Sequence, residues 1–258
     1  MELLTFLLVF IFGLAIGSFL NCVIYRLESS RSFLKGRSFC PRCKHVLAWY
    51  DLVPLISYLM LAGRCRYCKK TISTQYPLVE LATAFLFVAT FNFDHITRTI
   101  YLFIALSLFV IIFVFDLKHY IIPDKIVLPA IAISLVYNIF LLVTGDITSR
   151  IFLNFIYAGF FPALFFFLLF FLSKGKWMGF GDVKLAFFMG LFLGVPKILV
   201  ALFLAFMFGG IIGLGFVTFG NKTIKSEVPF GPFLISGTIL ALFFGTRLVN
   251  WYLSLLVI

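Results

Sequence analysis

Two aspartates stand where a carboxylate is costly, beside long apolar segments of the chain. Asp116 lies at the end of one apolar segment, and Asp182 lies between two others. A carboxylate near hydrocarbon is expensive and usually marks a functional site. If two such groups come close, one keeps a proton while the other acts as a base toward water. The pair therefore predicts acid–base chemistry on a membrane-bound substrate, as in peptide-bond hydrolysis by an aspartic dyad.

The residues around Asp182 favour this interpretation over an ordinary boundary position. Gly179 and Gly181 flank Phe180 directly before the aspartate. Glycines let the backbone approach a partner or an extended peptide closely. The alternative is that both aspartates are wetted by solvent or form ion pairs with nearby lysines, Lys118 for Asp116 and Lys184 for Asp182.

Four of the five cysteines form two C-x-x-C pairs separated by 21 residues, Cys40 with Cys43 and Cys65 with Cys68. This spacing is typical of a tetrahedral site in which four thiolates bind Zn²⁺. A site without an open position is structural, so we expect zinc to fix the shape of a polar loop. The alternative is two redox or disulfide pairs. Cys22, within an apolar segment, is expected to be a packing residue.

The composition indicates a membrane protein rather than a soluble one. Of the 258 residues, 63% are hydrophobic and only 12% are charged, and the mean hydropathy is +1.14. A soluble domain could not bury that much apolar surface. Residues 1–25 lack the basic start of a cleavable signal peptide and are expected to be a retained transmembrane helix.

A membrane-spanning helix needs about 20 apolar residues. The sequence predicts an all-α polytopic membrane protein with about eight transmembrane helices. The predicted segments are 3–25, 76–93, 99–115, 124–144, 150–173, 183–196, 198–219 and 231–256. The sixth segment is short, and Gly190 and Gly194 within it suggest a tilted or broken helix.

The distribution of basic residues predicts the orientation. Ten of the 21 Lys and Arg residues fall in the loop 26–75, and basic residues collect in cytoplasmic loops. Placing this loop in the cytoplasm puts 17 basic residues on that side and four on the other. The basic residues outside the loop that join its side are Lys118, Lys125, Lys174, Lys176, Lys184, Lys222 and Lys225. Both aspartates then lie at the cytoplasmic boundary.

The net charge of +11 is accounted for by this topology, so we expect no nucleic-acid partner. Basic residues around the cysteines, such as Arg42 and Lys69, are expected to meet anionic lipid headgroups. A reducing cytoplasm also favours the zinc site over disulfides. A transporter or channel with the aspartates lining an ion path remains an alternative, as does a non-catalytic assembly component.

Six ordered motifs resemble those of the type IV prepilin peptidases, membrane aspartic proteases with a G-x-G-D motif. The motifs are Gly17–Asn21 with Tyr25–Leu27, the two C-x-x-C pairs, Tyr76–Leu81, Asp116 with Ile122–Asp124, Gly179–Lys184, and Pro229–Phe233. The resemblance covers nearly the whole chain. Lys118 departs from it, since an acidic residue often stands there, and this makes Asp116 the catalytic choice.

The resemblance implies a bacterial inner-membrane enzyme that cuts the leader from type IV prepilins and pseudopilins on the cytoplasmic side. The zinc-bearing loop is typical of bifunctional members, which also methylate the new N-terminus using S-adenosylmethionine; cleavage without methylation is an alternative. We expect a first transmembrane helix at 1–25, a cytoplasmic zinc-binding loop domain at 26–75 that contributes to methyl transfer, and a peptidase core at 76–258.

The site for the methyl donor is not marked by a glycine-rich strand–turn–helix fingerprint. It must come from the loop and the nearby helix ends. Gly63, Glu80 and Arg26 are the candidates for binding S-adenosylmethionine. Glu80 has the alternative of a salt bridge to a loop arginine at a helix boundary.

Overall fold

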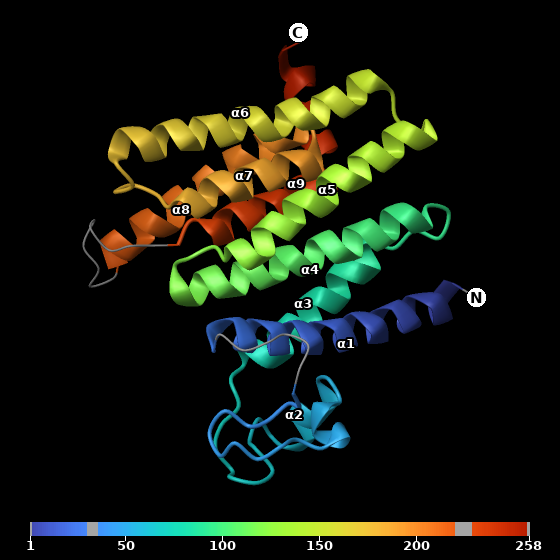
Figure 1. Ribbon diagram of the computed structural model, residues 1–258, viewed down its shortest axis with the longest axis vertical. Helices are drawn as coiled ribbons and strands as arrows, with labels where there is room; N and C mark the ends of the chain where they lie inside the picture. Colours follow the sequence, from blue (N-terminus) through green and yellow to red (C-terminus); the bar gives the residue numbers. More distant parts are fainter. Residues whose placement is uncertain (1, 30–35, 220–228, 257–258) are drawn as a thin grey trace. The chain divides into compact units, whose positions relative to one another are not determined.

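The computed structural model describes residues 2–29, 36–219 and 229–256 (Figure 1). Four basic residues used in the charge count, Arg31, Lys35, Lys222 and Lys225, lie outside this part of the chain. The described residues are helical and contain no strand, only two isolated bridges in the loop between the first two long helices. The predicted all-α class is confirmed.

The long helices follow the apolar segments. They are α1 (Glu2–Glu28), α3 (Gln75–Thr90), α4 (Ile96–His119), α5 (Asp124–Thr144), α6 (Ser149–Ser173), α7 (Phe180–Leu193), α8 (Lys197–Phe219) and α9 (Gly231–Leu256). Two short elements, the 3-10 helix η1 (Trp49–Leu52) and α2 (Ile56–Met60), lie in the loop after α1.

Six helices are long and apolar enough to cross a membrane, which makes the chain a multi-pass membrane protein. They are α1, α4, α5, α6, α8 and α9. Helices α3 and α7 have 16 and 14 residues, or about 24 and 21 Å at 1.5 Å per residue. Both are shorter than a hydrocarbon layer of about 30 Å. The predicted count of eight crossings is therefore not confirmed. Apolar loop residues had lengthened the predicted segment 76–93, whereas the segment 183–196 was already short and has 14 residues, like α7.

The chain divides into two compact units, residues 1–111 and 112–258, so that α4 begins in the first and ends in the second. In the first unit α1 crosses α3 (Figure 1). The crossing is close because a Cβ at Gly13 would lie 2.5 Å from Ala84 Cα, and one at Gly17 only 2.6 Å from Glu80 Cα. Two glycines four residues apart thus set this helix contact.

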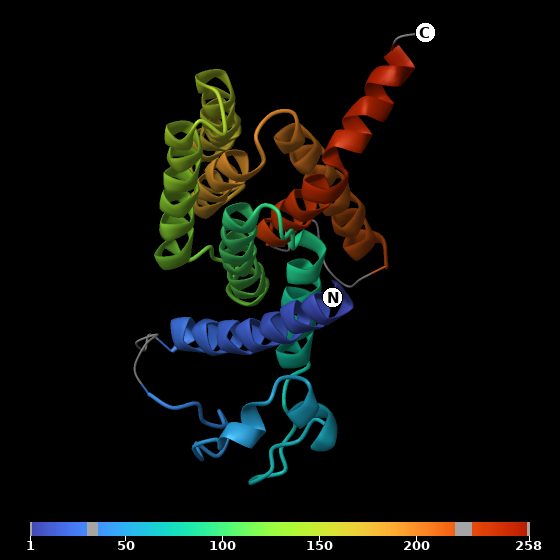
Figure 2. The same ribbon diagram turned by 90° about the vertical axis from the view of Figure 1, so that its right-hand side faces the viewer.

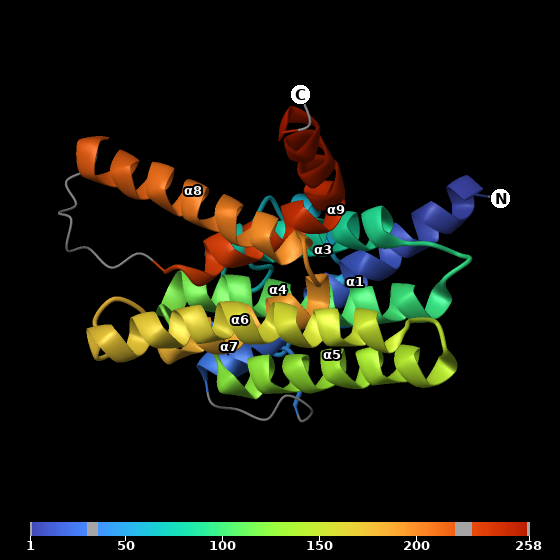
Figure 3. The ribbon, with the colours of Figure 1, turned by 90° about the horizontal axis from the view of Figure 1, so that it is seen from above.

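In the second unit α7 is the central element, and α5, α6 and α9 pack on it. Figure 3 shows α5, α6 and α7 running side by side. Ten of the 14 residues of α7 are buried, and Asn138 of α5 donates a hydrogen bond to the carbonyl of Leu191 at 3.0 Å. Helices α8 and α9 pack on each other, and the last turns of α9 extend away from α8 (Figure 2).

Candidate active site and metal centre

Asp116 and Asp182 both lie at helix ends in the second unit. Asp116 is in the last turn of α4, which runs on to His119 instead of ending before the aspartate. Asp182 is in the first turn of α7, which begins at Phe180 and not after the aspartate. The two residues are 4% and 8% exposed, and the charge of Asp116 acts on Asp182. The structure therefore brings together two buried carboxyl groups that stand 66 positions apart.

The neighbouring lysine of α7 has another partner. Lys184 Nζ donates to Asp124 Oδ1 at 2.6 Å, and Nζ lies 5.0 Å from the centre of the Phe180 ring. The alternative in which Lys184 neutralises Asp182 is not observed. The ion pair instead connects the N-terminal part of α7 to the first turn of α5.

The third helix end at this site is the start of α9. The backbone N–H of Gly231 donates a buried hydrogen bond of 3.0 Å to Oδ2 of Asp116. A Cβ at position 231 would lie 2.5 Å from the same oxygen, so only glycine fits this approach. Gly231 belongs to the last of the six sequence motifs, and its backbone contact with a side chain leaves no signal in the sequence.

Ile122 connects the segments that carry the two aspartates. A Cβ at Gly181 would lie 2.8 Å from Ile122 Cβ, and one at Gly231 would lie 3.5 Å from Ile122 Cδ1. The Ile122 side chain is 7% exposed. The buried Ile122 side chain thus packs on Gly181, which precedes Asp182, and on Gly231, which is hydrogen-bonded to Asp116. The sequence placed Ile122 in a motif but gave no reason for its position.

The four predicted cysteines form one cluster in the first unit. The Sγ atoms of Cys40, Cys43, Cys65 and Cys68 all lie within 4.8 Å of one another, and those of Cys40 and Cys68 are 4.0 Å apart. Tetrahedral Zn–S bonds of about 2.3 Å place sulfur atoms about 3.8 Å apart, so the donor set fits a metal ion. Cys22 is not part of this cluster.

Each cysteine pair begins an equivalent turn. The N–H of Cys40 donates to the carbonyl of His45, and the N–H of Cys65 to that of Lys70, both at 2.9 Å. The residue four positions after each first cysteine, Lys44 and Lys69, has a φ of 58° and 57°. Burial would raise the pKa of the Cys40 thiol, but nearby backbone N–H groups outweigh it and lower the pKa to about 7. The turn therefore favours the thiolate, the form that binds metal, at Cys40. At Cys43 the backbone N–H of His45 lowers the pKa, but burial and the neighbouring cysteines outweigh it and raise the pKa to about 11.

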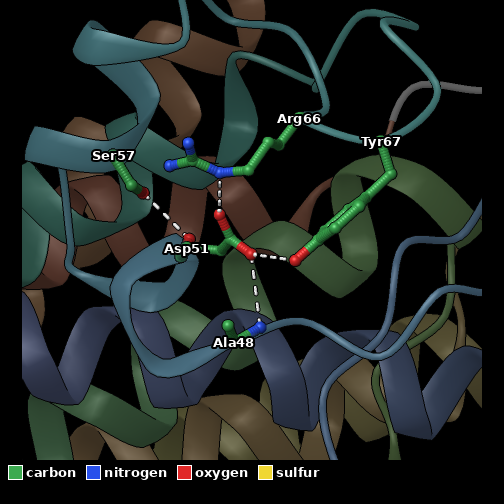
Figure 4. A network of polar contacts seen from close by, with 5 residues as sticks. All are labelled: Ala48, Asp51, Ser57, Arg66 and Tyr67. Atoms are coloured by element: carbon green, nitrogen blue, oxygen red, sulfur yellow. Dashed lines mark hydrogen bonds and ion pairs between the residues drawn. The ribbon is translucent and has the colours of Figure 1, made fainter.

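Asp51 holds the second turn in place (Figure 4). Its side chain is 3% exposed and accepts hydrogen bonds from Arg66 Nε at 2.8 Å, the Tyr67 hydroxyl at 3.0 Å and the Ala48 N–H at 3.2 Å. Burial alone would raise the pKa of Asp51, but these donors lower it. The bond to the carboxylate in turn raises the pKa of Tyr67 to about 12.

Arg66 and Tyr67 are the two residues between Cys65 and Cys68. The Tyr67 ring also lies against His45, with ring centres 3.7 Å apart, and His45 belongs to the first turn. Asp51 therefore supports both turns through Tyr67. Nothing in the sequence distinguishes Asp51 from the other polar residues of the loop, because its partners become neighbours only when the loop is folded.

The three candidates for binding a methyl donor have partners inside the first unit. Glu80 Oε2 accepts a 2.8 Å hydrogen bond from the N–H of Leu55, a residue with a φ of 59° before α2. Arg26 donates to the carbonyl of Gly36 at 2.6 Å. Gly63 has a φ of 67° and packs against the Tyr58 ring. Each candidate thus contacts a different residue of the loop region, Leu55, Gly36 or Tyr58.

Taken together, the helices and the two sites define a multi-pass membrane protein with a buried carboxyl pair and a four-cysteine cluster. Residues 11–93 match the model of the bacterial peptidase A24 N-terminal domain, and residues 102–214 match that of the type IV leader peptidase family. The chain belongs to the type IV leader peptidase family. No solved structure shows significant similarity to it.

Curated relatives span nearly the whole chain. One from Legionella pneumophila is 32% identical and covers 96% of this chain and 94% of its own. One from Aeromonas salmonicida is 34% identical and covers 97% of this chain and 94% of its own. One from Bacillus subtilis is 31% identical and covers 96% of this chain and 98% of its own. All three are named prepilin leader peptidase/N-methyltransferase.

Proposed function

We propose that the chain is a membrane aspartic endopeptidase that removes the leader peptide of type IV prepilins and pseudopilins. The names of its relatives point to this substrate. The observation that carries the mechanism is the pairing of two buried carboxyl groups, Asp116 from α4 and Asp182 from α7. One carboxylate activates water, and the other carboxyl group protonates the peptide oxygen.

The substrate geometry follows from the position of the pair. The apolar helix of a prepilin enters the membrane beside the enzyme, and its leader stays in the cytoplasm. Because Asp116 and Asp182 lie at helix ends, the scissile bond meets them near the membrane boundary. The charge distribution of the loops supports placing this boundary on the cytoplasmic side of a bacterial plasma membrane.

The peptidase role is tested with purified enzyme and a full-length prepilin in detergent. Asp116→Asn and Asp182→Asn each remove one ionisable oxygen while keeping the shape of the side chain. We expect both variants to insert and purify like the wild type and to leave the prepilin uncut. Normal processing by either variant would exclude the dyad.

A transporter or channel is the second candidate class, because buried carboxyl groups also line ion paths. The four-cysteine loop and the position of both aspartates at helix ends favour the peptidase. Ion flux into proteoliposomes without leader cleavage would support the transporter, and cleavage without flux the peptidase. A non-catalytic assembly component would keep its function after both carboxylates are removed.

The orientation is tested at the loop before α7. Trp177 is 75% exposed and lies five residues before Asp182. A Trp177→Cys variant in intact cells should react with a membrane-impermeant maleimide only after the inner membrane is permeabilised. Labelling above that of the parent chain in intact cells would place this loop, and the aspartates, on the outer side.

We propose that the four-cysteine cluster binds structural Zn²⁺ and shapes the loop 26–75, which lies between a first transmembrane helix at 1–25 and a peptidase core at 76–258. Bound metal would supply a fixed centre for both turns and leave no open position. The basic residues of the loop would face anionic lipid headgroups. Replacing Cys40 and Cys43 with Ser should lower the zinc content and increase proteolysis of the loop. Unchanged zinc content would reject the site.

We further propose that the chain methylates the new N-terminus with S-adenosylmethionine, as the second half of its relatives' names suggests. Gly63, Glu80 and Arg26 are kept as candidate binding residues. Glu80 is hydrogen-bonded to Leu55, and Arg26 is hydrogen-bonded to Gly36. These two side chains would therefore contribute by fixing the shape of the binding site. Loss of methylation with cleavage retained in Glu80→Gln would support this role. An unmethylated product from the wild type would indicate a peptidase without methyltransferase activity.

A further inference from the structure

The start of α9 donates a buried hydrogen bond of 3.0 Å to one of the two aspartates, Asp116. We propose that Gly231 is a positioning residue whose backbone N–H makes Asp116 the carboxylate that activates water, with Asp182 as its protonated partner. This inference rests on the proposed peptidase function and assigns the two roles within it.

Asp116 occupies the position of a cap for α9. Gly231 is the first residue of that helix, and the first N–H groups of a helix have no partner inside it. Asp116 satisfies one of them at 3.0 Å, 115 positions away in the sequence. A helix N-terminus carries partial positive charge, and a hydrogen bond to the charged form of a carboxyl group favours that form. Both effects keep the negative charge on Asp116.

The start of α9 is held firmly enough to act as a fixed donor. Phe230, the residue before Gly231, packs among aromatic rings of α6 and α8. Its ring centre lies 6.1 Å from that of Phe166 and 5.3 Å from that of Phe206. A Cβ at Gly231 would lie 3.5 Å from Ile122 Cδ1, and the Asp116 carboxylate leaves no room for it. The N–H therefore points at Asp116 before any substrate binds.

The charged form of Asp182 has weaker support than that of Asp116. Burial and the charge of Asp116 both disfavour the charged form of Asp182, the backbone N–H of Gly179 only partly offsets them, and Lys184 is paired with Asp124. The titratable group that faces Asp116 from a packed helix is Asp182 itself. When two close carboxyl groups share one proton, the proton stays on the group with the weaker support for its charge. That group is Asp182.

The roles give a balanced reaction. Asp116 takes a proton from water as the water oxygen bonds to the peptide carbon, and Asp182 gives its proton to the peptide oxygen. The C–N bond of the resulting gem-diol then breaks. The proton on Asp116 goes to the leaving nitrogen, and a hydroxyl proton of the gem-diol returns to Asp182. Both aspartates end in their starting states.

The test is Gly231→Ala in the full-length purified enzyme, with a full-length prepilin as substrate. Gly213→Ala on α8 is the matched control, because a Cβ there meets nothing within 4 Å. The added methyl group displaces the Asp116 carboxylate from its donor. We expect kcat to fall by about tenfold or more, with KM nearly unchanged. We also expect the acid limb of the kcat profile to move up by about one pH unit, because a lost hydrogen bond makes the base easier to protonate.

If Gly231→Ala does not fold, Phe230→Leu is used instead: it keeps the glycine, loosens the start of α9, and should move the acid limb the same way by less. A kcat and an acid limb equal to those of Gly213→Ala would overturn the inference. A lower kcat with an unmoved acid limb would also overturn it, since that result indicates a structural role alone. Cleavage by Asp116→Asn or Asp182→Asn would instead reject the peptidase function on which the inference rests.

Discussion

The two glycines before Asp182 are not equivalent, although they look alike in the sequence. A Cβ at Gly181 would lie 2.8 Å from Ile122 Cβ, whereas one at Gly179 would have its nearest neighbours at 3.9 Å. Real Cβ contacts essentially never fall below 3.0 Å, and ordinary ones begin at 3.4 Å. Gly181→Ala therefore forces a shift between 0.2 Å (3.0 minus 2.8) and 0.6 Å (3.4 minus 2.8).

Ile122 cannot rotate away from this contact, because the atom involved is its Cβ and the side chain is buried. Overpacking of this kind costs about 1–3 kcal/mol. The shift falls on the residue next to Asp182, and a catalytic group displaced by 1 Å loses about 10²-fold in rate. A shift near the upper bound therefore predicts a loss of about tenfold in kcat for Gly181→Ala.

Gly179→Ala should be mild by comparison. Its φ of −80° and ψ of 154° suit alanine, and its only expected cost is a poorer helix N-cap, about 1 kcal/mol or less. We expect less than about threefold loss of kcat. Both variants would be compared by prepilin cleavage and by thermal unfolding in detergent. Equal effects of the two substitutions, or wild-type cleavage by Gly181→Ala, would refute the close packing of Ile122 on this turn.

Three further variants probe contacts away from the pair. Asp124→Asn removes the charge that holds Lys184; because the Asp124 side chain is 58% exposed, we expect a loss of stability of about 1 kcal/mol or less and cleavage within a few-fold of wild type. Asp51→Asn should weaken metal retention about tenfold, measured by zinc transfer to a chelator, and unchanged retention would remove Asp51 from the support of the site. Asn138→Ala leaves the buried carbonyl of Leu191 without its donor and should lower the free energy of unfolding by about 1–2 kcal/mol, a loss that an unaltered unfolding curve would contradict.

The sequence predicted the helices well because their apolar runs are long and are interrupted by polar or glycine-containing turns. It placed Asp116 and Asp182 on the same side and the four cysteines at one metal site, since charge bias and C-x-x-C spacing are local signals. Its errors were at helix ends. Helix α4 runs on to His119, past the predicted end at residue 115, and α7 begins at Phe180, before the predicted start at residue 183. Gly194, with a φ of 68°, ends α7 after 14 residues, in agreement with the short segment predicted there.

Contacts between a backbone group and a distant side chain could not be predicted. No residue type in the sequence indicates that the N–H of Gly231 donates to Asp116. Asp51 likewise looks like any other polar residue of the loop. Ile122 is one of many apolar residues until its two glycine neighbours are known. Gly231 and Ile122 position the aspartates, and Asp51 supports the cysteine turns, whereas the motifs predicted only which groups take part.

The central claim is that Asp116 and Asp182 cut a prepilin as a pair. The most direct measurement is the mass of the prepilin N-terminus after co-expression with the wild type or with Asp182→Asn. The account predicts a shortened, methylated N-terminus with the wild type and the intact leader with Asp182→Asn. A shortened N-terminus in cells that contain only Asp182→Asn and no other such peptidase would contradict it.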